Sequence, residues 1–257
     1  MEIIFIKLVF LNKHFNMRTL LLTFTFVFIV SCQSAADKKE TKKTDVPASD
    51  WVSLSPKDSF EGWHIFQNES GEKTGWSVQD GVFTFDKENA SGKGNKSLLT
   101  DAVYSSFEIQ FDWKLSPNSN SGFMWGVNED KKYDHPFVTG PEIQIIDAAV
   151  YGDDPEHQRH TVGALYDMLP PSNIASKEPG AWNTYHITVN HKQNEGIVVL
   201  NGTEINRFPL SGPQWDALVE DSKFSKIPDF GTFKEGHLSL QDHPGVISYR
   251  NIKIRQL

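Results

Sequence analysis

The chain has 257 residues and a formal net charge of −8, with 38% hydrophobic and 12% aromatic residues. This balance is typical of a globular protein and argues against a largely disordered one. The negative charge would repel a phosphate backbone, so nucleic acid is not expected as a partner. The roughly 200 residues beyond position 50 are enough for one sizeable hydrophobic core.

Residues 1–32 have the features of a lipoprotein signal peptide. The apolar run over residues 20–30 is too short for a comfortable membrane span but suits the core of a signal peptide. Residues 29–32 read Ile-Val-Ser-Cys and resemble a lipobox, so Cys32 is the predicted lipidation site. The alternative is an ordinary signal peptide with a chance cysteine. Acyl chains on Cys32 would bind a bilayer firmly, so we expect a lipid-anchored protein of the bacterial cell envelope, on a periplasmic or cell-surface face.

Residues 33–50 separate this leader from the rest of the chain. They are rich in Ser, Ala, Lys, Thr and Asp, their charges balance, and they show no apolar period. This composition predicts a flexible, solvated tether. The membrane contact is therefore expected through the anchor only, with residues 51–257 forming the functional domain.

Residues 51–257 predict an all-β domain. Asp80-Gly81 and Asn201-Gly202 each lie between apolar runs and are typical of β-hairpin turns. Residues 107–115 alternate strictly between apolar and polar side chains, which indicates a strand with one buried face. Further strands are expected around residues 185–189, 238–240 and 252–254, and one short helix near residues 215–222. Many short strands without helical repeats predict a β-sandwich or jelly roll, and the long polar segment 153–179 predicts a functional loop.

Residues 140–147 are the first candidate for chemistry. Glu142 and Gln144 share one face of a predicted strand, and a β-bulge at residues 145–146 would return Asp147 to that face. Such a row resembles the acidic strand motif of laminarinase-like retaining endo-glucanases. That chemistry needs carboxyl groups only about 5–5.5 Å apart, which the spacing and the short Asp side chain make hard to reach. The alternative is a solvated outer face of a strand.

Residues 236–243 form a second candidate. Two leucines point to the core, which leaves His237, Ser239, Gln241 and His243 on the other face. A polar face with two histidines suits sugar binding or proton transfer, and a plain solvated face is the alternative.

A third candidate is the histidine-rich loop that contains His160, followed by Tyr166. No spacing there is diagnostic of zinc, which favours loop fixing or substrate contact over metal ligation. Trp182 could stack on a sugar ring, although a buried core tryptophan is an equal alternative. Asn120, in the string Asn120-Ser121-Gly122, completes these candidates.

Taken together, these strings resemble the 3-keto-disaccharide hydrolase domain family, in order over nearly all of residues 51–257. The matching strings are Asn120-Ser121-Gly122, residues 140–147, residues 160–167, Trp182-Asn183, Asn201-Gly202, Ser222-Lys223-Phe224, residues 236–243 and Arg250-Asn251-Ile252. The resemblance implies a concanavalin-like jelly roll that acts on oligosaccharides or glycosides oxidised at C3. The chain has Ala181 where the family often has Glu, and Gly126 where some members have Arg, which points to a different sugar or leaving group.

The chemistry of such an enzyme follows from the ketone. A ketone at C3 acidifies the C2 hydrogen, so a base can remove it, the C1 substituent can leave with help from an acid, and water can add back. We expect Glu142 to act as the base and His243 or Asp147 as the acid. The expected substrate-binding residues are Asn120, Gln144, His160, Tyr166, Trp182 and Gln241.

Two other functions remain open at this point. A retaining endo-glucanase of the laminarinase type is favoured by the row from Glu142 to Asp147. A non-catalytic carbohydrate-binding module is favoured by the many aromatic residues. No metal ligand or cofactor is assigned, although a divalent cation is left open, as is the choice between the lyase, the hydratase and the full hydrolase step.

Overall fold

The structure is a computed structural model that describes residues 50–68, 70, 74–152 and 154–257. The predicted signal peptide, its Cys32 and the predicted tether before Asp50 lie outside the described residues. Within the described ranges, no helix is long and apolar enough to cross a membrane.

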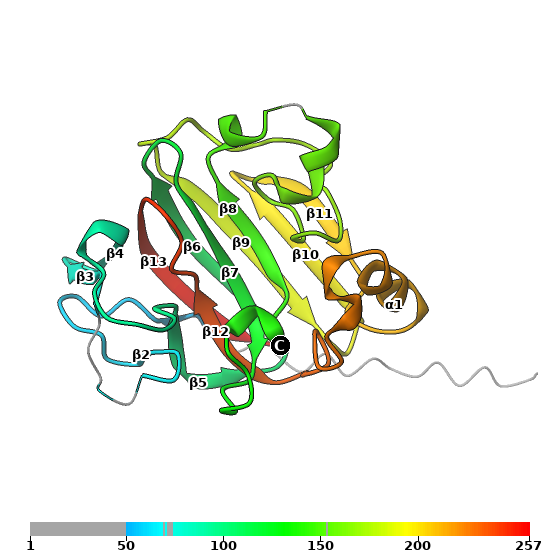
Figure 1. The fold of residues 1–257 in the computed structure, drawn as a ribbon, viewed down its shortest axis with the longest axis horizontal. Helices are drawn as coiled ribbons and strands as arrows, with labels where there is room; N and C mark the ends of the chain where they lie inside the picture. Colours follow the sequence, from blue (N-terminus) through cyan, green and yellow to red (C-terminus); the bar gives the residue numbers. More distant parts are fainter. Residues whose placement is uncertain (1–49, 69, 71–73, 153) are drawn as a thin grey trace, which may run out of the picture. The chain divides into compact units, whose positions relative to one another are not determined.

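The strands form two antiparallel sheets (Figure 1). The larger sheet has the order β11-β10-β9-β6-β13-β4-β3, and β1 also pairs with β13. Its strands are β1 (Val52–Ser53), β3 (Trp76–Gln79), β4 (Val82–Asp86), β6 (Phe107–Leu115), β9 (Asn183–Asn190), β10 (Glu195–Leu200), β11 (Thr203–Phe208) and β13 (Val246–Gln256). The smaller sheet has the order β2-β5-β12-β7-β8. Its strands are β2 (Trp63–Ile65), β5 (Leu98–Tyr104), β7 (Asn120–Val127), β8 (Glu142–Ile146) and β12 (Gly236–Leu240).

The core lies between the two sheets. In β6 every second residue is buried, as its alternating sequence predicts, and the rings of Phe111 in β6 and Phe123 in β7 lie 5.5 Å apart between centroids. Each large apolar side chain buried in this way contributes about 1.5–3 kcal/mol to folding. The predicted concanavalin-like β-sandwich is therefore confirmed.

Both predicted hairpins are present. Asp80 and Gly81 have φ angles of 51° and 74°, and Asn201 and Gly202 have φ angles of 50° and 84°. Positive φ at both central residues is the requirement of the tight turn that matches the twist of paired strands, and Asn, Asp and Gly adopt it at low cost.

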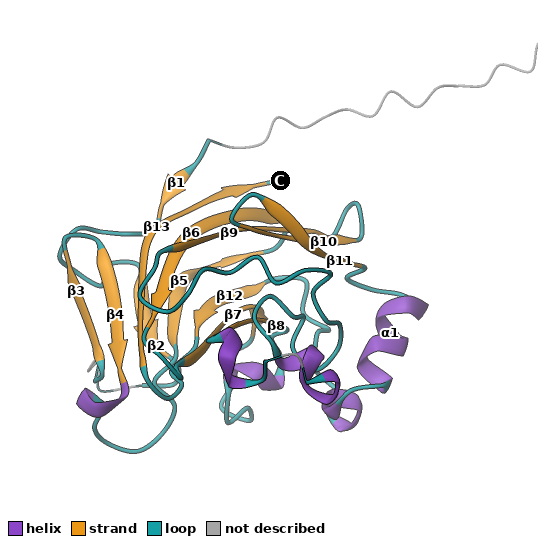
Figure 2. Cartoon of the chain, turned by 90° about the horizontal axis from the view of Figure 1, so that it is seen from above, coloured by secondary structure: helices purple, strands orange, loops and turns teal. Residues whose placement is uncertain are grey.

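Short helical segments connect the strands. They are η1 (Lys87–Asn89), η2 (Pro136–Val138), η3 (Ala148–Val150), η4 (Pro155–His160), α1 (Pro213–Glu220) and η5 (Lys223–Lys226). The α1 helix is the one expected near residues 215–222. Figure 2 shows that the helical segments near β8 lie on the side of the smaller sheet that faces away from the larger sheet, hereafter the outer face. These segments build walls around the outer face, where the candidate site lies.

Candidate active site

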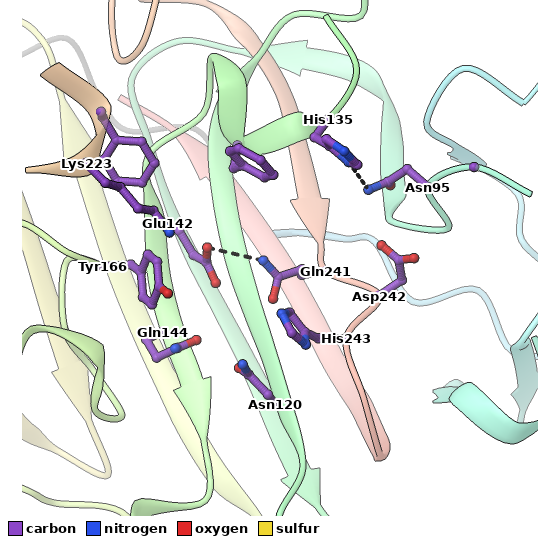
Figure 3. A pocket seen from close by; sticks show the side chains of 13 residues that line it. Asn95, Asn120, His135, Glu142, Gln144, Tyr166, Lys223, Gln241, Asp242 and His243 are labelled. Carbon is purple, nitrogen blue, oxygen red and sulfur yellow. Dashed lines mark hydrogen bonds between the residues drawn. The ribbon is translucent and has the colours of Figure 1, made fainter. Parts of the chain in front are cut away.

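A pocket of about 320 Å³ opens on the outer face of the smaller sheet (Figure 3). In β8, Ile143 and Ile145 point into the core, so the alternation of the strand places Glu142 and Gln144 on the outer face. The lining residues are Gly94, Asn95, Asn120, His135, Phe137, Glu142, Gln144, Tyr166, Lys223, Phe224, Gln241, Asp242 and His243.

Glu142 lies at the centre of this pocket and is 5% exposed. Burial raises the pKa of Glu142 to about 8, although the charge of Lys223 and a hydrogen bond from Gln241 oppose the shift. The Gln241 amide donates to Glu142 Oε2 at 3.2 Å. Gly122 on β7 makes room for the carboxyl, because a Cβ atom at Gly122 would lie 2.0 Å from Glu142 Oε1.

Three carboxamide side chains line the same pocket as this carboxyl. Asn120 Oδ1, Gln144 Oε1 and Gln241 Oε1 are buried and have no hydrogen-bond partner within the described part of the chain. The Gln144 amide donates to the carbonyl oxygen of His160 at 3.2 Å, which leaves its own oxygen as an acceptor. A buried acceptor without a partner costs about 1–3 kcal/mol, so the pocket favours a ligand that brings hydrogen-bond donors.

The segment 163–166 pairs with the free edge of β8 and closes one side of the pocket. Gln144 donates its backbone N–H to Ala164, and Tyr166 donates its backbone N–H to the Glu142 carbonyl at 2.9 Å. This pairing brings the Tyr166 ring beside Glu142. Burial and the nearby Glu142 charge raise the pKa of Tyr166 to about 12, so its hydroxyl stays protonated at neutral pH.

Lys223 and His243 are two further ionisable residues that line the pocket. The Lys223 ammonium lies 4.2 Å from the centre of the Tyr166 ring, and Figure 3 shows its side chain extending toward Glu142. Loss of water contact lowers the pKa of His243, with Asp242 acting in the opposite direction and Lys87 and Lys223 adding to the decrease. The surroundings of His243 therefore favour its neutral form.

Six of the sequence-predicted residues line this one pocket. They are Asn120, Glu142, Gln144, Tyr166, Gln241 and His243. His160 lies just behind the pocket wall. Its ring centroid is 5.0 Å from that of Tyr166, and its backbone carbonyl accepts a hydrogen bond from the Gln144 side-chain amide.

Asp147 lies elsewhere, and the prediction that it shares the face of Glu142 is wrong. The pairing of β8 with β7 has no register shift, so the expected bulge is absent and β8 ends at Ile146. Asp147 instead caps η3, where its oxygens accept the backbone N–H groups of Ala149 at 3.0 Å and Asn118 at 2.9 Å.

Trp182 is also outside the pocket. Its ring packs against Arg250 at 4.0 Å and Lys114 at 4.9 Å, on the face of the larger sheet that points away from the core. The expected stacking of Trp182 on a sugar in the same site as Glu142 is therefore not supported by its position.

Other lining residues were not identified from the sequence as site residues. Lys223 belongs to the string Ser222-Lys223-Phe224, which supported the family resemblance, but nothing in that string indicates a contact with β8. Asn95 and His135 come from loops whose local sequence carries no signal of a site. Within the described residues, no group of three or more His, Cys, Asp or Glu side chains is arranged to hold a metal ion.

Two solved structures share this architecture. A putative glycosyl hydrolase from Parabacteroides distasonis superposes with a TM-score of 0.72 at 30% identity, over 80% of this chain and 94% of that chain. A second putative glycosyl hydrolase from the same organism gives a TM-score of 0.59 at 26% identity, over 81% of this chain and 100% of that chain. The fold and the pocket thus define a β-sandwich protein similar to proteins described as glycosyl hydrolases.

The sequence comparison gives the family. Residues 50–255 match the family described as the 3-keto-alpha-glucoside-1,2-lyase-like domain, and the chain belongs to this family. A 3-keto-disaccharide hydrolase from Bacteroides thetaiotaomicron is 27% identical, in an alignment that covers 86% of this chain and 83% of that protein. The resemblance drawn from the sequence strings is therefore confirmed, and it indicates a carbohydrate-active enzyme.

Proposed function

We propose that this chain cleaves the glycosidic bond of sugars oxidised to a ketone at C3, and that Glu142 starts the reaction by removing the C2 proton. The observation that carries the proposal is a buried carboxyl, with its pKa raised to about 8, among three carboxamide oxygens that have no partner. A proton-transfer group works best when its pKa lies near the operating pH.

The proposed steps are an elimination followed by a hydration. The Glu142 carboxylate takes the C2 proton, and the electron pair of the broken C–H bond forms an enolate with the C3 ketone. The enolate then collapses, the C1–O bond breaks, and the leaving oxygen takes a proton. Addition of water to the resulting C1–C2 double bond completes a net hydrolysis, and a chain that stops before this addition is a lyase.

The pocket suits a neutral, hydroxyl-rich ligand. The free oxygens of Asn120, Gln144 and Gln241 can accept hydrogen bonds only from donors such as sugar hydroxyl groups. The volume of about 320 Å³ is near the lower end of ligand pockets, which run from about 300 to 1,000 Å³. A short glycoside therefore fits this pocket better than a long polysaccharide chain.

The leaving oxygen can take its proton from His243 or from Tyr166, and the Tyr166 hydroxyl is the group that still carries its proton at the pH where Glu142 is ionised. Of the two acids expected from the sequence, His243 lines the pocket and Asp147 does not. Tyr166 keeps its hydroxyl proton at neutral pH and supplies a second donor in the same pocket.

A retaining endo-glucanase would need a second free carboxylate in the pocket beside Glu142, and the described lining residues supply none. Besides Glu142, the only carboxylate that lines the pocket within the described residues is Asp242. Its two oxygens accept the Lys96 backbone N–H and the Ser97 hydroxyl, both at 2.7 Å. A retaining glycosidase needs a free nucleophilic carboxylate about 5–5.5 Å from the acid, whereas both oxygens of Asp242 are engaged by the segment that precedes β5.

Replacing Glu142 tests this proposal. Glu142→Gln keeps the shape of the side chain and removes the base, so kcat on a 3-keto-glucoside should fall by about 10²–10⁴-fold with KM changed little. Asp147→Asn is the matched control, because it alters a buried carboxyl outside the pocket and should leave turnover by the folded protein unchanged. For the unaltered chain, kcat/KM should rise with pH up to about 8 as Glu142 loses its proton.

The fate of the C2 hydrogen separates the enzyme mechanisms. Solvent deuterium should appear at C2 of the hydrated product, and a substrate deuterated at C2 should react more slowly where proton removal limits the rate. Cleavage of an unoxidised glucan without exchange at C2 would establish the endo-glucanase instead. Sugar binding without turnover of either substrate, unchanged in Glu142→Gln, would establish a binding module.

The location of the protein remains a separate proposal. We propose that the chain is held at the bacterial envelope by a lipid on Cys32, because residues 20–32 have the pattern of a lipoprotein leader.

A further inference from the structure

Asp167 links two walls of the pocket without lining it. One of its oxygens, Oδ1, lies 2.6 Å from His160 Nε2, and the other, Oδ2, accepts the backbone N–H of Lys223 at 2.6 Å. The backbone N–H of Asp167 donates to the Arg159 carbonyl at 2.9 Å. One side chain therefore joins the loop after η4 to the start of η5, across a separation of 56 residues.

The backbone of Asp167 is held in an uncommon conformation. Its φ angle is 61°, in the left-handed region that side chains other than Gly, Asn and Asp rarely adopt. Such conformations persist where the surrounding contacts fix them, and here the three hydrogen bonds of Asp167 do so.

Two of the side chains tied by Asp167 meet at Tyr166, which lines the pocket. The Lys223 ammonium lies over the Tyr166 ring at 4.2 Å, and the His160 ring packs on the same tyrosine. The charge of Lys223 also acts on Glu142, whose proton affinity it lowers. A cation at this place favours the ionised base and then the negative charge that develops on the enolate.

We propose that Asp167 is a positioning residue, which holds the Lys223 ammonium over Tyr166 and beside Glu142 and so acts on the reaction without touching the substrate. Lys223 is exposed and long, so without an anchor at its backbone the ammonium would spread over many positions. The kinetic part of this inference rests on the proposed function, whereas its electrostatic part does not.

The pKa of Glu142 distinguishes positioning from a simple charge effect. If Asp167 were only a nearby negative charge, its removal would lower the pKa of Glu142. If Asp167 holds Lys223 in place, its removal displaces a positive charge and raises that pKa. The other titratable groups around Glu142 are Tyr166, His243, Asp242, His135 and the buried Tyr249.

Four variants of the full chain test the inference. Lys223→Met removes the ammonium, and Asp167→Gly removes the carboxylate while leaving a residue that adopts φ 61° freely. The third variant combines both changes. Asp167→Asn is the conservative variant, because its oxygen can still accept the Lys223 N–H, its amide can reach His160, and Asn tolerates the left-handed region.

Asp154→Ala is the matched control. Asp154 accepts the backbone N–H of Glu156 at 2.9 Å and lies 2.9 Å from His157 Nδ1, so it has the same type of partners at the other end of η4 but no link to Lys223. Its removal should leave both kcat and the pKa of Glu142 unchanged.

We expect kcat on a 3-keto-glucoside to fall about 10²-fold in Lys223→Met and at least about 10-fold in Asp167→Gly, with KM changed less. The double variant should match Lys223→Met within about 2-fold, because Asp167 acts through Lys223. An infrared titration of the carboxyl band, with Glu142→Gln as the reference, should show a raised pKa of Glu142 in Lys223→Met and in Asp167→Gly. Asp167→Asn should restore most of kcat.

Additive losses in the double variant, or a lowered pKa of Glu142 in Asp167→Gly, would overturn the inference. If Asp167→Gly does not fold, an unchanged pKa of Glu142 in Lys223→Met would overturn it as well. If the unaltered chain turned over no 3-keto-glycoside, the proposed function would fail, and the infrared titration would still decide whether Asp167 positions Lys223.

Discussion

Gly122→Ala is the sharpest test of the pocket geometry. Gly122 lies on β7 beneath the Glu142 carboxyl, and its φ lies outside the left-handed region, so an alanine there causes no backbone strain. The added Cβ would lie 2.0 Å from Glu142 Oε1, 2.6 Å from Cδ and 2.8 Å from Cγ. Ordinary contacts of this kind lie at 3.4–4 Å, so the carboxyl has to move.

The size of the effect follows from that movement. The carboxyl retreats by roughly 1 Å or more, and a misplacement of this size in a reacting group costs about 10²-fold in rate. The free energy of unfolding should change by no more than about 1 kcal/mol, because the displaced group is the end of a side chain that faces a pocket.

The assay compares kcat/KM on a 3-keto-glucoside with the thermal unfolding midpoint. Gly196→Ala is the matched control, because its Cβ would lie 2.2 Å from the Phe208 ring, outside the pocket lining, and its φ is also outside the left-handed region. We expect Gly122→Ala to lose activity and keep its unfolding midpoint, and Gly196→Ala to do the reverse. Activity of Gly122→Ala within a few-fold of the unaltered chain would refute the role assigned to Glu142.

Three further predictions concern stability and location. Glu142 binds its proton more tightly in the folded protein than in the unfolded chain, because burial raises its pKa from 4.5 to about 8. Between these two pH values the free energy of unfolding should therefore fall as pH rises, by at most roughly 1.4 kcal/mol per pH unit. Urea unfolding of Glu142→Gln should lack this slope. Asp147→Ala should lower the free energy of unfolding by about 1 kcal/mol, because it removes the cap of η3, while turnover by the folded protein persists. Cys32→Ser should release the protein from membranes, as measured by fractionation of cells, and retention in the membrane fraction would contradict the lipobox interpretation.

Much of the fold could be predicted because strands and turns leave local patterns. The side-chain period of 2 in β6 identified the buried face, and the residue types of Asp80-Gly81 and Asn201-Gly202 identified turns that need positive φ. The same period placed Glu142 and Gln144 together on the outer face. These features depend on neighbours within a few residues, which a single sequence displays.

Tertiary structure decided where each strand ends and what meets across the chain. A bulge would have returned Asp147 to the row of Glu142, but the backbone N–H of Asn118 binds the Asp147 carboxylate beyond the end of β8. Trp182 has a side chain of the type that stacks on sugar rings, yet its ring packs against Arg250 and Lys114 on the larger sheet, away from the pocket on the smaller sheet.

The contribution of Lys223 also depends on a contact between segments that are distant in the sequence. The sequence by itself determined the sandwich, the family and the row of polar residues on β8, because each rests on local periodicity or on short ordered strings. Only the folded chain brings η5 to Asp167 and Tyr166, because that contact joins segments 56 residues apart and leaves no periodic trace in either. The chemistry of the pocket therefore depends on a carboxyl that the pattern predicted and on a cation that packing alone supplies.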